Sequence, residues 1–145
     1  MSVTVVRESL VLDGSSWKCT GASCDLDIIV GRDMNLSGNA LVESDKSSSL
    51  MAISIARHLH MYDTATVQAL GYMSTIALST SASVLLADTS LMKTSTIRLI
   101  SPTMDIAIGA KIDLNGRGYA EGTGTSVGKA KTDVTWTSCC NDEHE

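Results

Sequence analysis

The sequence predicts an all-β chain that coils into a parallel solenoid of about five turns, with three short strands in each turn. Apolar residues alternate with polar ones in short runs separated by Gly, Ser, Asp and Asn, as in half-buried strands. These runs recur at a near-constant spacing of 21 to 25 residues, which is the mark of a repeat architecture. The 145 residues include 20 Ser, 15 Thr and no Phe, a composition that suits a narrow aliphatic core.

A pair of apolar residues two positions apart marks the first strand of each turn. The pairs are Val3/Val5, Ile28/Val30, Ile53/Ile55, Ile76/Leu78 and Ile97/Leu99. Their first members lie 25, 25, 23 and 21 residues apart. Equivalent residues of successive turns stack about 4.8 Å apart in a parallel solenoid. One internal column of isoleucines is therefore expected, made of Ile28, Ile53, Ile76 and Ile97.

Two further series of apolar residues predict the second and third strands. The second series is Leu10/Leu12, Met34/Leu36, Leu59/Met61, Val84/Leu86 and Ile106/Ile108. The third is weaker: Trp17/Cys19, Ala40/Val42, Ala65/Val67, Leu91 and Ile112/Leu114. A β-sandwich also contains many short strands, but it does not require a three-part pattern at a near-constant period.

The three-strand repeat over residues 3–114 resembles the right-handed parallel β-helix, also called the pectin-lyase-like fold. Residues 112–119, Ile-Asp-Leu-Asn-Gly-Arg-Gly-Tyr, are similar to the strand-then-glycine-turn endings of large β-helical surface proteins and adhesin passengers. The left-handed class, with hexapeptide repeats and about 18 residues per turn, fits less well. The resemblance implies the fold and no particular activity.

The repeat pattern stops after Leu114. Residues 115–128 carry five glycines, and the chain ends in the acidic sequence Cys-Cys-Asn-Asp-Glu-His-Glu. We therefore expect β-helix turns over residues 1–114, followed by a Gly-rich end loop and an acidic, Cys-containing tail over residues 115–145.

The cysteines indicate the compartment. Cys19 and Cys24 are five residues apart, a spacing that a turn can close into a disulfide loop, whereas Cys139 and Cys140 are adjacent and their pairing stays open. The sequon Asn35-Leu-Ser is a candidate glycosylation site. These features favour an extracellular or cell-surface module, although no secretory leader is recognised in the first ten residues. A reduced cytosolic protein is the alternative.

Charge and hydropathy exclude two partner classes. A net charge of −5 argues against binding to nucleic acid by phosphate neutralisation. No stretch approaches 18 uninterrupted apolar residues, so no membrane span is predicted.

The chemistry-bearing side chains do not form a recognised motif. His58 and His60 share one face of a strand with Asp63 nearby, but two exposed polar residues explain this pattern better than a metal site. Outward carboxylates are expected at Asp25, Asp27, Asp105 and Asp113. Residues 64–92 contain a single charged residue, so the central turns offer little for an acid–base site. We predict no catalytic residue, no cofactor and no metal.

Two functions are compatible with this pattern. The first is a non-catalytic structural or adhesive module that associates with itself or with neighbouring chains through the ends of the solenoid. The alternative is a carbohydrate-active enzyme or carbohydrate-binding domain. It would need an outward cleft of carboxylates and aromatic rings, for which only Tyr62, Tyr72 and Tyr119 are available as tyrosines.

Overall fold

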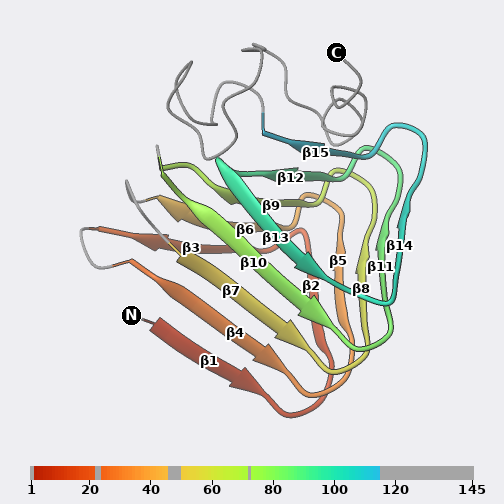
Figure 1. Cartoon of the computed structure of the whole chain (residues 1–145), viewed down its shortest axis with the longest axis horizontal. Helices are drawn as coiled ribbons and strands as arrows, with labels where there is room; N and C mark the ends of the chain where they lie inside the picture. The colour runs from red at the N-terminus through yellow and green to blue at the C-terminus, as the bar shows by residue number, and fades with distance from the viewer. Residues whose placement is uncertain (1, 22–23, 46–49, 72, 115–145) are drawn as a thin grey trace, which may run out of the picture.

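The computed structural model describes residues 2–21, 24–45, 50–71 and 73–114. Within these ranges the chain forms fifteen strands and no helix (Figure 1). The first strands of the five turns are β1 (Ser2–Val6), β4 (Leu26–Val30), β7 (Leu50–Ile55), β10 (Thr75–Thr80) and β13 (Thr96–Ile100). The second strands are β2 (Leu10–Asp13), β5 (Met34–Ser37), β8 (His58–Met61), β11 (Ser83–Leu86) and β14 (Thr103–Ile106). The third strands are β3 (Ser16–Thr20), β6 (Leu41–Asp45), β9 (Thr66–Ala69), β12 (Leu91–Lys93) and β15 (Lys111–Asp113).

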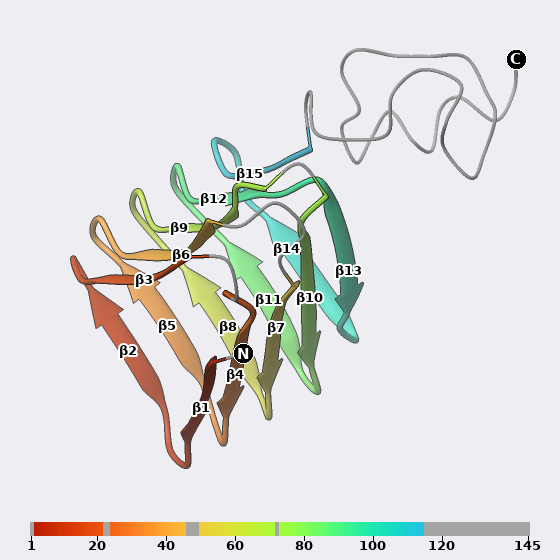
Figure 2. The ribbon, with the colours of Figure 1, turned by 90° about the vertical axis from the view of Figure 1, so that its left-hand side faces the viewer.

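Every strand pairs in parallel with the equivalent strands of the turns next to it. Sheet A has the order β1-β4-β7-β10-β13, sheet B β14-β11-β8-β5-β2, and sheet C β15-β12-β9-β6-β3. Figure 2 shows the turns side by side, each contributing one strand to every sheet. The chain is therefore an all-β parallel β-helix with three strands per turn, which confirms the predicted fold.

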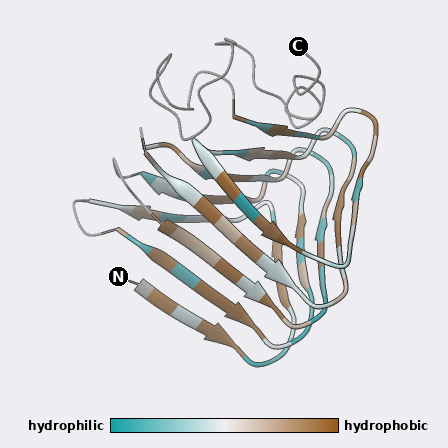
Figure 3. Ribbon diagram, in the orientation of Figure 1, coloured by the Kyte–Doolittle hydropathy of each residue, from teal (hydrophilic) through white to brown (hydrophobic). Residues whose placement is uncertain are grey.

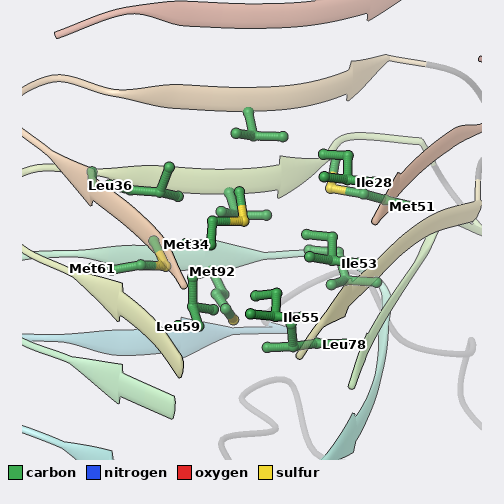
Figure 4. Close-up of a cluster of buried hydrophobic side chains, with 14 of the residues drawn as sticks. Ile28, Met34, Leu36, Met51, Ile53, Ile55, Leu59, Met61, Leu78 and Met92 are labelled. Carbon is green, nitrogen blue, oxygen red and sulfur yellow. The ribbon is translucent and has the colours of Figure 1, made fainter. Parts of the chain in front are cut away.

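The core lies between the three sheets and is filled by aliphatic and Met side chains. Strands of the middle turns alternate buried and outward residues, as in β4 and β10 (Figure 3). Side chains of sheets A, B and C, among them Ile53, Leu59 and Met92, point into one interior (Figure 4). Because an interior position has neighbours in the turns above and below, short branched side chains fill the space completely.

The isoleucine column predicted for sheet A is broken between Ile53 and Ile76, whereas Ile76 and Ile97 are in register as expected. Ile28 stacks on Ile53 as expected, but Ile53 is in register with Leu78, whereas Ile76 is in register with Met51. β7 and β10 each have three inward side chains, whereas each predicted apolar pair contains only two of them. The predicted pair is the last two inward residues of β7 but the first two of β10, so the pairs are offset. Sheet A therefore contains three internal columns, and the four isoleucines are divided between two of them.

The apolar pair predicted for β1 faces outward. Val3 and Val5 are 54% and 61% exposed, and Thr4 is in register with the buried Ile28. Side chains alternate along a strand, so a shift of one residue in register moves the whole apolar set to the other face. Pairing with β4 decides this register, and periodicity within β1 does not reveal it.

The last turn and sheet C require two smaller corrections. In β14 the inward residues are Met104 and Ile106, whereas Ile108 lies in the tight turn between β14 and β15 and is fully exposed. In β12 it is Met92 that is buried, and Leu91 faces outward. Both errors place a residue one or two positions from its true stack, because the turn lengths vary from one coil to the next.

A stacked β-turn connects sheets B and C in successive coils. The amide N of Ala40 donates to the carbonyl O of Ser37 over 3.1 Å, and the amide N of Ala65 donates to that of Tyr62 over the same distance. Gly38 and Asp63, the second residues of these turns, have positive φ angles of 61° and 55°. Asp adopts this conformation more readily than most residues other than Gly, so the same turn is kept in both coils.

Buried hydroxyl groups fill the corner between sheets C and A. The Oγ of Ser74 donates to the carbonyl O of Ala69 or of Gly71, each over 2.7 Å, and the Oγ of Ser95 donates to that of Gly71 over 3.1 Å. Thr94 Oγ1 donates to the carbonyl O of Ser74 over 3.1 Å. These side chains satisfy backbone groups of the corner that are buried away from water.

The predicted end loop and tail, residues 115–145, lie outside the described residues, as do Tyr72, Tyr119, Cys139 and Cys140.

Candidate interaction surfaces

The two ends of the solenoid are the first candidate surface. In the first turn the inward side chains Leu10, Leu12 and Trp17 are only partly buried. The inward side chains of the last turn are also partly buried: Ile97, Leu99, Met104, Ala110 and Ile112. Each of these residues packs on a neighbouring turn on one side only, among the residues described. Over the described residues, the first and last turns therefore bury their inward side chains less completely than the middle turns.

The backbone at the ends has the same one-sided character. Strands β1, β2 and β3 are the outermost strands of their sheets at one end, and β13, β14 and β15 are outermost at the other. Within the described part of the chain, each of these six strands pairs with a single neighbour. Their outer N–H and C=O groups provide a template for strand addition.

Trp17 is the largest inward side chain of the first turn. It lies in β3, in register with Val42 of the next turn, and is half-buried. Equivalent positions in the middle turns hold Val67 and Met92. An indole ring is accommodated at this position because no described turn lies on its other side.

A disulfide links Cys19 of β3 to Cys24, with a Cα–Cα distance of 5.7 Å, as the spacing predicted. Cys24 is buried, and its carbonyl O accepts a hydrogen bond of 3.1 Å from the Oγ of Ser44 in β6. The disulfide therefore bridges the start and the end of the segment that connects the first turn to the second. It belongs to the end of the solenoid rather than to its middle.

The outward carboxylates do not converge. Asp25 and Asp27 share the outer side of sheet A, where an oxygen of Asp25 accepts a hydrogen bond of 3.0 Å from the amide N of Leu50. Asp105 is on β14 of sheet B, and Asp113 is on β15 of sheet C. The three sheets point in different directions, so neither Asp105 nor Asp113 can form an acid–base pair with Asp25 or Asp27 on one surface.

The two histidines form a small polar cluster on the outer side of sheet B. The rings of His58 and His60 stack with their centroids 5.5 Å apart, and the ring of Tyr62 lies edge-on to His60 at 6.1 Å. The Nδ1 of His58 is hydrogen-bonded to the Oγ of Ser83 in the next turn at 2.7 Å. The hydrogen bond between His58 and Ser83 thus joins the cluster to the next turn.

Asp63, considered as a third ligand, does not join the histidines. Its carboxylate accepts a hydrogen bond of 2.9 Å from the amide N of Gly38 in the turn between sheets B and C. Over residues 2–21, 24–45, 50–71 and 73–114, no group of three or more His, Cys, Asp or Glu side chains is placed to hold a metal ion. No helix that could cross a membrane is found in the same residues.

The candidate glycosylation site is in the middle of a strand. Asn35 faces outward from β5 and is half-buried, between Val11 and His60 of the neighbouring strands. Its modification stays a prediction.

Sequence reasoning missed the turn that joins sheets B and C. Asp63 and Asp88 occupy equivalent positions, and the amide N of Asp63 donates to Oδ2 of Asp88 over 3.0 Å. The hydroxyl groups of the following residues, Thr64 and Thr89, each donate over 3.0 Å to a carbonyl of the turn before, that of Gly38 or Asp63. The repeated Asp-Thr dipeptide, 25 residues apart, was the available signal.

Comparison with known proteins identifies no relative: no family model matches the chain, and no curated protein or solved structure matches it significantly.

Proposed function

We propose that the chain is a non-catalytic structural or adhesive module that associates with itself or with neighbouring chains through the ends of its solenoid. The observation that supports the proposal is the incomplete burial of the core in the first and last turns. Stacking one chain on another would bury side chains such as Leu12 and Ile112 and would pair the open strand edges. The burial of these side chains and the pairing of the strand edges both result from stacking one chain on another.

The absence of enzymatic activity is part of this proposal. Asp105 and Asp113 are on sheets other than that of Asp27, and Asp25, on the same side of sheet A as Asp27, accepts a hydrogen bond from the backbone amide of Leu50. The histidine cluster contacts a serine and a tyrosine of its own surface. A glycosidase needs two carboxyl groups within about 5–10 Å on one surface. Incubation with acidic and neutral polysaccharides should produce no new reducing ends and no unsaturated products. Turnover lost on changing Asp25, Asp27 or Asp105 would replace the structural proposal with the carbohydrate-active alternative.

We propose an extracellular or cell-surface location for the module. The disulfide between Cys19 and Cys24 supports this location, because such bonds persist in oxidising compartments. Peptide mass mapping of native material without reduction is the test. Free thiols at both positions would contradict the proposal.

End-to-end association is tested by placing a charge at the open end of the core. Leu12 points inward at the first turn, whereas Val11, its neighbour on β2, is 62% exposed on the outer side. We expect Leu12→Lys to remain folded, since the lysine reaches water past the end of the core, and to reduce assembly size in sedimentation velocity. The matched control Val11→Lys adds the same charge and should leave the assembly unchanged. Equal behaviour of the two variants would contradict association through the ends, as would a wild-type chain that stays monomeric at high concentration.

A further inference from the structure

On the strands of sheet A the outward charged residues are Asp27 and Arg98, fewer than on sheet C, where Lys18, Glu43, Lys93 and Lys111 are among those that face outward. The strands β4, β7, β10 and β13 lie side by side (Figure 1). Two columns of outward side chains run across all four strands, and a third, Leu50, Thr75 and Thr96, runs across the last three. The first column is Asp27, Ala52, Ala77 and Arg98. The second column is Ile29, Ser54, Ser79 and Ile100. We call these eight residues the sheet A face.

The sheet A face has a symmetric pattern. In the first column two alanines separate an acidic residue, Asp27, from a basic one, Arg98. In the second column two serines separate Ile29 from Ile100, which are 40% and 67% exposed. Long side chains thus occupy the outer strands of the face, and short ones occupy the inner strands.

We propose that the sheet A face binds the same face of a second copy of the chain through a two-fold axis parallel to the strands. Rotation about this axis keeps the strand direction and reverses the order of the turns. Asp27 of each copy then faces Arg98 of the other, and Ile29 faces Ile100. In the same arrangement Ala52 faces Ala77 and Ser54 faces Ser79, so the short side chains of the two copies lie opposite one another at the centre of the contact. Such a self-complementary contact is what an isologous dimer requires.

The charges support a second copy as the occupant. Among the described residues, neither Asp27 nor Arg98 makes a side-chain hydrogen bond or an ion pair. The proposed dimer provides each of them with a partner, twice in the interface. It also covers the exposed Ile29 and Ile100, which would otherwise remain in water.

The size of the face predicts weak pairing. Four strands of about five residues cover about 300 Å² per copy, against about 800 Å² per partner in a stable complex. An isolated pair should therefore dissociate readily, and the contact gains strength where several copies are already joined. This lateral contact goes beyond association through the ends and does not depend on it.

Charge reversal tests the proposal. Asp27→Arg places Arg against Arg in both pairs of the dimer, and Arg98→Asp places Asp against Asp. Each variant alone should dimerise about ten-fold more weakly in sedimentation equilibrium. An equimolar mixture should regain wild-type affinity, because both pairs are again of opposite charge. Asp105→Arg on sheet B is the matched control and should behave as the wild type. Equal thermal melting of all variants would show that the fold is unchanged.

Two results would overturn the proposal. One is wild-type association by both single variants, and the other is a mixture that associates no better than they do. Association through the ends gives open-ended growth with concentration, whereas the sheet A face gives a dimer and stops. A dimer that is kept by Leu12→Lys but lost in Asp27→Arg would contradict association through the ends and would leave the sheet A proposal intact. Long assemblies that are kept by Asp27→Arg but lost in Leu12→Lys would contradict the sheet A proposal and would leave association through the ends intact.

Discussion

The middle turns and the end turns of this solenoid have the same pattern of inward apolar residues but bury those residues to different extents. Leu78 in the fourth turn is 1% exposed, whereas Leu99, stacked on it in the fifth turn, is only partly buried. The two leucines are in the same column of the same sheet. Their difference shows that burial in a repeat protein comes from having a neighbour on both sides, and not from the residue or its strand.

The end turns also depart from the pattern that the middle turns keep. Val3 and Val5 face outward from β1, and Ile100 and Ile108 are exposed in the last turn. In the middle turns, by contrast, the inward residues of β4, β8 and β11 are buried throughout. A strand between two others is hydrogen-bonded to both, so two neighbours fix its register, whereas the register of an end strand is fixed by one neighbour.

The largest effect is expected from truncating the two stacked leucines. Leu78→Ala should lower the free energy of unfolding by about 2–5 kcal/mol, because it leaves a cavity between two turns. Leu99→Ala is the matched change and should cost about half as much, since solvent already reaches that side chain. Urea unfolding monitored by circular dichroism measures both. Equal losses would mean that the last turn is covered as well as the fourth.

The disulfide should stabilise the first turns by about 2 kcal/mol, because closing a short loop removes little entropy from the unfolded chain. Replacing Cys19 and Cys24 together by Ser should produce this loss. The variant should then be insensitive to reductant, whereas the wild type should lose the same amount when reduced. Hydrogen exchange would localise the change: amides of β2 and β3 should exchange faster, and those of β10 and β11 should not. Uniform acceleration across all turns would contradict a local role.

A smaller effect is expected at the turns between sheets B and C, where the third coil has Asp63 and the first and last have Gly14 and Gly109. Asp63→Ala removes the acceptor of the Gly38 amide and places Ala at a positive φ, and should cost about 1 kcal/mol. Asp63→Asn, which keeps an acceptor and tolerates this conformation, should lie close to the wild type. Thermal melts rank the variants. An Ala variant as stable as the Asn variant would show that neither contribution matters.

The smallest effect is expected from the ion pair between the first two turns. Arg32 Nη1 lies 3.2 Å from Glu8 Oε2, and the two side chains are 56% and 75% exposed. Such a pair is screened by water, so Glu8→Gln should change the free energy of unfolding by less than about 1 kcal/mol. Urea unfolding at low and high salt should give nearly the same difference between variant and wild type. A larger loss would indicate that the first turn depends on charge as well as on packing.

Much of the fold was predictable because parallel stacking repeats the same chemical requirement in every turn. Alternation identified the inward residues of β4, β5 and β8, and the five-residue spacing of Cys19 and Cys24 predicted the disulfide. The errors occur where the repeat is irregular, as at Ile76, which has Met51 as its partner in place of Ile53. The lengths of the turns between strands set these offsets, and turn residues give only a weak signal in the hydropathy pattern.

The candidate surfaces were less predictable than the core. Asp25 and Asp27 were correctly placed on one face, but the presence of Asp27 and Arg98 in one outward column depends on four strands being in register. Similarly, Asp63 was close to the histidines in sequence, and its carboxylate contacts the preceding turn instead. Residues that are 71 positions apart become members of one column only when the offsets of all the turns between them are known.

By itself the sequence determined the class of fold, the number of strands per turn and most of the residues that face the core, because hydropathy acts on every residue within its own strand. Only the tertiary structure decided the orientation of β1, the pairing of Met51 with Ile76 and the residues that share each outer column. These depend on hydrogen bonds between strands whose paired residues are at least 20 positions apart, and such pairing is a property of two strands together.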